Sequence, residues 1–353
     1  MMYLTGIAAA APSPSFTQAE CWAALQNAPQ FAQLNARSHA VLKKVLSGGN
    51  GIVTRHLAVD NLADAFVLTP DALHARFTQH APALATQAAE RALAAARLTS
   101  AQVDAVLIST CTGYLCPGLT SYVSERLGLR SDVMALDLVG QGCGAALPNW
   151  RTAEALLAAG RAQHALSVCV EVCSAAFYLD NDPGVLISAC LFGDGASAAV
   201  LSAQPAAYAR RVEWKASSSL LIPTKRDSLR FEQRDGMLRN ILTREVPDLA
   251  ARHVETLLSE MLSGYPLRRA ELTGWILHAG GREVLAALKK RLGLSDAELG
   301  ISAAVLRDFG NVSSPFVLFV LEQTLAQNAP GGWWWMASFG AGFSCHGALL
   351  KVD

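Results

Sequence analysis

Short apolar stretches with the character of buried strands alternate with alanine- and leucine-rich stretches of helical spacing along the whole chain. This alternation is typical of α/β proteins, in which layers of helices cover the sheets. The stretch 203–234 has mixed charge and weak periodicity, so we divide the chain near its start into two halves, 1–205 and 206–353. The predicted strands are 103–109, 133–139, 165–172, 274–278, 333–337 and 345–352, and the predicted helices are 82–97, 144–159, 282–291 and 316–325.

The composition excludes several classes of protein. Apolar residues make up 52% of the 353 residues and charged residues 16%, which predicts a large buried core rather than disorder. The 29 basic residues equal the 29 acidic ones, so no net charge favours nucleic acid or an anionic membrane. No apolar run is long enough for a spanning helix, and the alanine-rich start lacks the basic region of a secretory signal. We expect a cytoplasmic protein.

The chain has eight cysteines, which is a poor disulfide framework at this length. Cys111 and Cys116 are close in sequence, as are Cys169 and Cys173, but neither pair has zinc-site spacing with a matching second pair. We therefore predict no metal site, and we expect most of these thiols to behave as small buried apolar groups.

Cys143 is the exception, because it follows an apolar strand and lies between two glycines in the segment LDLVGQGCGAALP. Gly142 and Gly144 permit a tight turn, and the helix that begins there directs peptide N–H groups toward the sulfur. A helix N-terminus favours the thiolate, which is the nucleophilic form. A GCG segment taken alone is equally compatible with an ordinary buried cysteine.

Two later segments carry further candidates. GWILHAGG reads as a strand that ends on His278 and is followed by glycines. FGNVSSP reads as a turn that places Asn311 at the start of an apolar helix. Taken alone, His278 could be a core histidine and Asn311 a helix cap.

Together, Cys143, His278 and Asn311 resemble the catalytic triad of the type III polyketide synthases, the chalcone synthase superfamily. FGDGAS is similar to that family's FGDGA segment and places Phe192 at its gatekeeper position. SFGAGFS is similar to its GFGPG loop, in which Gly340 and Gly342 flank Ala341 where proline is usual. The resemblance implies a thiolase-like fold with duplicated α-β-α-β-α layers and a homodimer.

The same resemblance implies a substrate cavity. CTGYLCPG is similar to the stretch that lines the family's initiation cavity, and Glu171 falls on its buried glutamate. The turn HAGG departs from the more usual HPGG. Small or polarisable side chains suggest room for a fatty chain, as in the bacterial alkylresorcinol and alkylpyrone synthases, although Tyr114 could close that route. The cavity residues implied are Cys111, Thr112, Gly113, Tyr114, Cys116 and Cys173, together with Gly340, Ala341 and Gly342 of the C-terminal loop.

The implied substrates are malonyl-CoA and an acyl-CoA, with no further cofactor. Cations at the tunnel entrance would bind the CoA phosphates, and the candidates by position are Lys43, Lys44, Arg55 and Arg282. Each is also compatible with an ordinary surface charge.

The resemblance implies iterative decarboxylative condensation of malonyl-CoA onto a starter held on Cys143, followed by cyclisation to a resorcinol or pyrone type product. The alternatives left open are a ketoacyl-ACP synthase III-like enzyme and a non-catalytic acyl-CoA-binding protein. A ketoacyl-ACP synthase III typically follows its histidine with Gln-Ala-Asn, whereas this chain has Ala-Gly-Gly after His278. An HMG-CoA synthase would require a catalytic glutamate.

Overall fold

The computed structural model describes residues 1–47, 49–207 and 210–353. The strands are β1 (Met2–Ala10), β2 (Ser15–Thr17), β3 (Thr54–His56), β4 (Ala105–Thr110), β5 (Met134–Val139), β6 (His164–Glu171), β7 (Gly195–Ser202), β8 (Val212–Arg226), β9 (Leu229–Arg234), β10 (Met237–Leu242), β11 (Leu272–Leu277), β12 (Gly332–Gly340) and β13 (Gly342–Val352). The helices are α1 (Gln18–Gln26), α2 (Pro29–Ala32), α3 (Ala36–Ser47), α4 (Pro70–Ala95), α5 (Leu119–Leu127), α6 (Ala146–Ala158), α7 (Pro183–Leu191), α8 (Val246–Ser263), α9 (Arg282–Leu292), α10 (Asp296–Phe309) and α11 (Phe316–Ala326).

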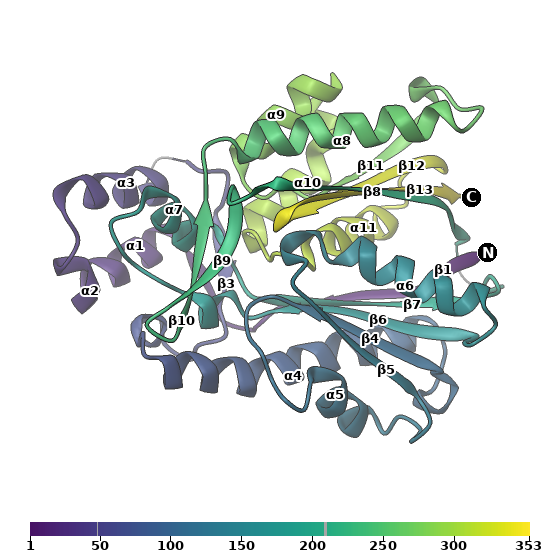
Figure 1. Ribbon diagram of the computed structural model, residues 1–353, viewed down its shortest axis with the longest axis horizontal. Coiled ribbons are helices and arrows are strands. Elements are labelled where there is room, and N and C mark those ends of the chain that lie inside the picture. The colour runs from purple at the N-terminus through teal and green to yellow at the C-terminus, as the bar shows by residue number, and fades with distance from the viewer. Residues whose placement is uncertain (48, 208–209) are drawn as a thin grey trace.

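The large sheet joins the two halves of the chain. Its strand order among the described residues is β11-β12-β13-β8-β1-β7-β6-β4-β5, so strands from each half lie together. β1 and β8 pair only at their ends, from Met2 opposite Trp214 to Leu4 opposite Val212. The two parts of the sheet diverge from this short pairing into separate layers (Figure 1).

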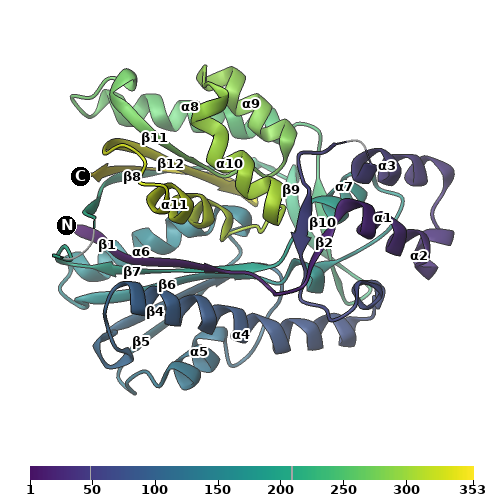
Figure 2. The ribbon, with the colours of Figure 1, turned by 180° about the vertical axis from the view of Figure 1, so that it is seen from behind.

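The helices complete five layers. α8 and α9 cover the outer face of the part formed by β8 and β11–β13, and α4 and α5 cover the outer face of the other part (Figure 1). α6 and α11 lie between the two parts, as the reverse view also shows (Figure 2). The predicted thiolase-like α-β-α-β-α architecture is therefore confirmed.

The predicted strands and most predicted helices are present within a few residues, but the helix at 82–97 is a correction. α4 begins at Pro70, where Thr69 accepts a hydrogen bond from the N–H of Ala72 at 3.2 Å and caps the helix. A capping threonine followed by proline is a strong start signal. Pro82 lies inside this helix, whose Ala81, Ala85 and neighbouring alanines are fully buried.

The stretch 203–234 contains β8 and β9, which its weak periodicity did not predict. β8 carries three successive serines, and its place is set by antiparallel backbone pairing along most of β13 rather than by apolar alternation. The division into halves at 205 and 206 stays a prediction. No helix among the described residues is long and apolar enough to cross a membrane.

Candidate active site

Cys143 lies in a turn of 3₁₀ helix, Gly142–Gly144, directly before α6. The turn packs against the β12–β13 connection from the other half of the chain. Gly142 has φ +55°, and a Cβ there would lie 2.9 Å from the backbone nitrogen of Ala341. A Cβ on Gly340 would lie 2.5 Å from the nitrogen of Gly144. Close backbone approach therefore explains the glycines on both sides of this contact.

The residue Cys143 is 8% exposed, and its Sγ lies 3.2 Å from Ser313 Oγ. Burial raises the pKa of the Cys143 thiol to about 12, with the charge of Glu171 acting in the same direction. The helix start therefore does not by itself hold a thiolate here, because desolvation favours the neutral thiol. Nucleophilic attack by Cys143 would therefore require a base that takes the thiol proton.

His278 directly follows β11 and its ring lies between two aromatic side chains. The ring centroids of Phe316 and Phe339 are 5.1 and 4.9 Å from it, both edge-on. Burial lowers the pKa of His278 to about 3, so the imidazole is neutral at physiological pH. Both ring nitrogens are buried without a hydrogen-bond partner among the described residues. A neutral imidazole has one N–H donor and one acceptor nitrogen, and both are free for substrate.

Asn311 is held in place by its own side chain and backbone. Its Nδ2 donates to the carbonyl of Gly280 at 3.0 Å, and its Oδ1 accepts from the N–H of Ser313 at 2.9 Å. The amide NH2 has two hydrogens, so one donor remains after the bond to Gly280. The backbone of Asn311 forms an isolated bridge with Phe192. The predicted gatekeeper and the amide donor are thus fixed to each other.

A cleft of about 1200 Å³ leads to these residues. We call it the entrance cleft. Cys143, Phe192, His278 and Asn311 all line it. Its lining also includes the cationic side chains Lys44, Arg244, Arg282, Lys290 and Arg291.

A second cavity, of about 50 Å³, lies beyond Cys143 and Phe192, which also line it. We call it the inner cavity. Cys111, Thr112, Cys173 and Ala341 contribute to its wall. Since a buried water occupies on the order of 10–15 Å³ on the same measure, this space holds only a few small groups. A long fatty chain would not fit in it.

Glu171 lies at the end of β6 and is fully buried beside the inner cavity. Burial raises the pKa of Glu171, while the Ser314 hydroxyl at 2.6 Å, the amide of Cys111 at 3.0 Å and the Thr112 hydroxyl at 2.9 Å stabilise its charge. The bonds to Cys111 and Thr112 fix the part of the CTGYLCPG segment that reaches the cavity.

Other predicted cavity residues lie elsewhere. The predicted residues that line neither cavity are Gly113, Tyr114, Cys116, Gly340 and Gly342. Tyr114 is 71% exposed and Cys116 is also exposed. A Cβ on Gly113 would lie 2.3 Å from the ring of Phe77, so this glycine serves helix packing. Gly342 has φ +119°, a conformation that L side chains rarely adopt.

The four cationic residues predicted to bind CoA lie in different places in the structure. Lys44 and Arg282 line the entrance cleft, whereas Lys43 is exposed on α3 outside its lining. Arg55 lies instead at the inner cavity, 5% exposed, and donates to the carbonyls of Ala189 at 2.8 Å and Phe192 at 3.1 Å. Both bonds commit the guanidinium to the backbone at the end of α7, away from the entrance cleft.

Sequence reasoning missed Ser313 and three cations of the cleft, Arg244, Lys290 and Arg291. Ser313 has φ +58°, which is uncommon for a residue other than glycine, but no sequence pattern reports it. Lys290 and Arg291 are in the last turn of α9, where basic residues are common for helix stability alone. These two side chains reach the cleft only because of the way α9 packs, which the sequence pattern does not show.

Comparison with known proteins identifies the family. Residues 17–220 match the family described as FAE1/Type III polyketide synthase-like protein, and residues 213–352 match the C-terminal domain of chalcone and stilbene synthases. The chain is 32% identical over 250 residues to a 3,5-dihydroxyphenylacetyl-CoA synthase of Streptomyces toyocaensis. That match covers 69% of this chain and 64% of the relative, just under two thirds of its length.

A second sequence relative and a solved structure support the same family. The chain is 30% identical over 287 residues to an alpha-pyrone synthesis polyketide synthase-like protein of Mycobacterium tuberculosis, covering 79% of this chain and 73% of that one. The crystal structure of PKS-I from the brown alga Ectocarpus siliculosus superposes with a TM-score of 0.90 at 25% identity, covering 100% of this chain and 98% of the other. The resemblance seen in the sequence motifs is confirmed, and the chain belongs to the type III polyketide synthase family.

Proposed function

We propose that the chain elongates an acyl-CoA starter with malonyl-CoA by repeated decarboxylative condensation on Cys143. One observation carries this proposal: Cys143, His278, Asn311 and Phe192 line the same cleft, and the orphaned nitrogens of His278 lie at a buried site. Such unsatisfied polar groups are costly unless a substrate uses them. A non-catalytic acyl-CoA-binding protein would have no need of this arrangement.

The first step loads the starter. Cys143 Sγ attacks the thioester carbonyl of the acyl-CoA, and the neutral imidazole of His278 takes the thiol proton. The bond from the carbonyl carbon to the CoA sulfur breaks, and the proton returns from His278 to the departing CoA thiolate. The high pKa of the buried thiol makes a neighbouring base necessary, and the low pKa of His278 keeps that base unprotonated before the reaction.

In the second step His278 acts as a hydrogen-bond donor, together with Asn311. Malonyl-CoA loses carbon dioxide when the bond to its carboxyl carbon breaks, and the electron pair passes to the thioester as an enolate. The N–H of His278 and the free hydrogen of Asn311 Nδ2 stabilise the charge on the enolate oxygen. Phe192 excludes water and offers the malonyl carboxylate no solvation, which favours its loss. The enolate carbon then attacks the acyl carbonyl carbon on Cys143 and forms the new carbon–carbon bond. The bond from that carbonyl carbon to Sγ breaks, and Cys143 leaves as a thiolate that can take the extended chain from its CoA thioester in the next round.

The charges of the entrance cleft suit CoA. Lys44, Arg244, Arg282 and Lys290 supply positive charge to a chain with no net charge, and we propose that they bind the CoA phosphates. Arg291 forms an ion pair with Glu255 at 2.7 Å and Arg282 forms one with Glu283 at 3.0 Å, so these two contribute less than Lys44, Arg244 and Lys290.

The inner cavity supports a short starter and ring closure to a resorcinol or pyrone type product. Its small volume favours a compact acyl group and a few extension units over a fatty chain. The names of the two bacterial relatives, a dihydroxyphenylacetyl-CoA synthase and an alpha-pyrone synthesis protein, agree with an aromatic or pyrone product.

We further propose a cytoplasmic homodimer that contacts its partner through β5. β5 lies at one edge of the sheet, and most of its residues are exposed although its sequence, MALDLV, is apolar except for Asp137. Val139 is 57% exposed and Met134 37%. A long apolar edge strand left in water invites pairing with another chain. A second copy of the same strand would cover it.

Asn311→Ala should separate loading from decarboxylation. Because the variant lacks one oxyanion donor, carbon dioxide release from malonyl-CoA should fall on the order of a hundredfold or more. The starter should still load onto Cys143, as read by the mass of the intact protein. Asn27→Ala, the same change at an exposed helix end, serves as the control and should release carbon dioxide at the wild-type rate. Near-normal release by Asn311→Ala would refute the role of the amide.

Cys173→Phe should shorten the product. The phenyl ring would occupy much of the inner cavity, and each methylene of the growing chain that it excludes lowers the yield of full-length product about fourfold. Cys173→Ser, which leaves the volume nearly unchanged, should give the wild-type product pattern. Chromatography with mass detection would measure the ratio of full-length to truncated products. An unchanged ratio in Cys173→Phe would show that the growing chain does not enter this cavity.

Val139→Lys should weaken the dimer, because a charge on the paired edge would be buried without a partner. Sedimentation velocity of the wild type should give twice the 37.4 kDa of the chain, and the variant should shift toward the single-chain mass. Val67→Lys places the same charge at another exposed valine and should leave the mass unchanged. A wild-type protein that sediments as a single chain would overturn the homodimer.

A further inference from the structure

β9 and β10 form a two-stranded hairpin that, in the described part of the chain, is not hydrogen-bonded to the large sheet. Its turn is made by Asp235 and Gly236, with φ of +51° and +75°. This left-handed pair is the geometry of tight two-residue hairpin turns. The hairpin rests against α7 so closely that a Cβ on Gly184 would lie 2.2 Å from the carbonyl oxygen of Leu242.

The hairpin and α7 both form the wall of the inner cavity. Leu229, Phe231 and Asn240 line it from the hairpin, and Val185 and Ser188 line it from α7. The shape of the cavity therefore depends on how these two elements sit against each other.

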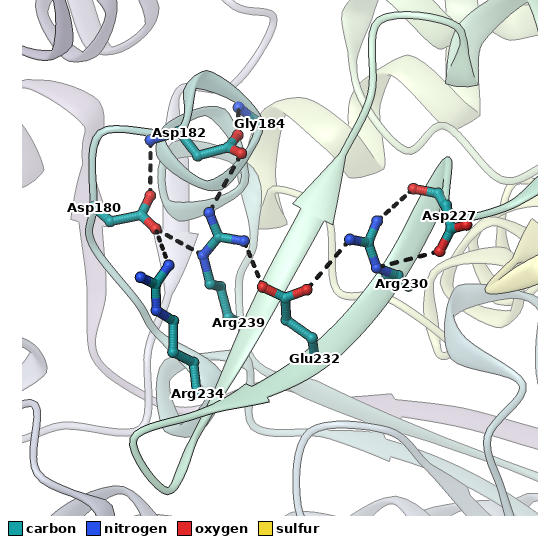
Figure 3. A network of polar contacts seen from close by, with 8 residues as sticks. All are labelled: Asp180, Asp182, Gly184, Asp227, Arg230, Glu232, Arg234 and Arg239. Atoms are coloured by element: carbon teal, nitrogen blue, oxygen red, sulfur yellow. Dashed lines mark hydrogen bonds and ion pairs between the residues drawn. The ribbon is translucent and has the colours of Figure 1, made fainter.

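Arg239 of β10 is the centre of the contact between them (Figure 3). Its Nε lies 2.7 Å from Asp180, one terminal nitrogen lies 3.3 Å from Asp182, and the other lies 2.7 Å from Glu232 on β9. Asp180 and Asp182 belong to the loop before α7. One guanidinium thus binds both strands of the hairpin to that loop.

The cluster connects to the cavity at two places. Asp182 caps α7 by accepting the N–H of Gly184 at 2.8 Å, and the same helix ends at Phe192. On the other side, Glu232 pairs with Arg230 at 3.2 Å, and Arg230 lines the inner cavity.

Burial distinguishes Arg239 from its neighbours. Its side chain is 8% exposed, and it is surrounded by carboxylates in the geometry that the planar guanidinium fork allows. Removal of Arg239 would leave three partly exposed carboxylates, those of Asp180, Asp182 and Glu232, close together without their common cation, so they would repel one another. Arg234 contacts the same Asp180 at 3.7 Å, but its side chain is 56% exposed, and an exposed pair of this kind contributes little.

We propose that Arg239 is a positioning residue for polyketide extension: it holds the β9–β10 hairpin against α7 and so sets how many malonyl units the inner cavity accepts. Arg239 touches no substrate, and its effect passes through the wall residues Phe231 and Asn240. This inference rests on the proposed function. It adds a residue that lies outside the active site and yet determines the length of the product.

The test compares Arg239→Gln with Arg234→Gln as the matched control. Arg239→Gln should change the ratio of products that differ by one malonyl unit at least about fourfold, the factor that corresponds to one buried methylene. Its release of carbon dioxide from malonyl-CoA should stay at the wild-type rate, because the bridge to Asn311 and the hydrogen bond from Arg55 hold the backbone of Phe192 independently of Arg239. Arg239→Lys keeps the charge but loses the fork, so its product ratio should also be shifted. Arg234→Gln should match the wild type in both measurements.

Hydrogen–deuterium exchange supplies a readout that does not depend on catalysis. In Arg239→Gln the amides of 229–242 and 183–191 should exchange faster than in the wild type, and in Arg234→Gln they should not. If Arg239→Gln does not fold, Asp180→Asn removes one carboxylate while leaving Asp182 and Glu232, and it should shift the same ratio. A folded variant with the wild-type product ratio, or with unchanged exchange in both segments, overturns the proposal. A wild-type protein that makes no polyketide would instead overturn the proposed function, and the exchange comparison would still decide the role of Arg239.

Discussion

The close backbone contact between two turns, Gly142–Gly144 from one half of the chain and Gly340–Gly342 from the other, is the constraint on which the site depends. A Cβ on Gly340 would lie 2.4 Å from the carbonyl oxygen of Gln141, so no larger residue fits there without movement. The Ser338 hydroxyl reinforces the contact by donating to the carbonyl of Gly144 at 3.1 Å. This contact brings Cys143, carried by the first half, to a cleft whose other reactive side chains come from the second half.

Burial then determines the chemistry available in the cleft. The same desolvation that raises the pKa of Cys143 lowers the pKa of His278, so the cleft contains a neutral thiol and a neutral imidazole. A neutral imidazole can accept the thiol proton in one step and donate to an enolate oxygen in the next. A permanently charged histidine could donate to the enolate oxygen but could not accept the thiol proton. The backbone bridge between Phe192 and Asn311 fixes the positions of these two residues relative to each other.

Much of this arrangement could be predicted from the sequence because the motifs are local. The order of GCG, HAGG and FGNVSSP placed Cys143, His278 and Asn311 at element ends, and the structure brings all three to the entrance cleft. The alternation of strands and helices was enough to predict the layers. The role of each of these residues in catalysis remains a proposal.

What the sequence did not show depends on tertiary packing. Arg55 was assigned to CoA by position, yet its strand turns it inward to the backbone of Phe192. Cys116 looked like a cavity residue but is exposed, because the segment leaves the cavity after Thr112. β8 has no apolar alternation, since its partner strand rather than its side chains sets its conformation.

The central claim is that Cys143 alone carries the growing chain, and the site of acylation tests it most directly. The purified protein would be incubated with an acyl-CoA starter, quenched in acid, digested and mapped by peptide mass. The account predicts an acyl thioester on the peptide that contains Cys143, with Cys111 and Cys173 unmodified although both line the same inner cavity. An acyl group on Cys111 or Cys173, with Cys143 free, would contradict it.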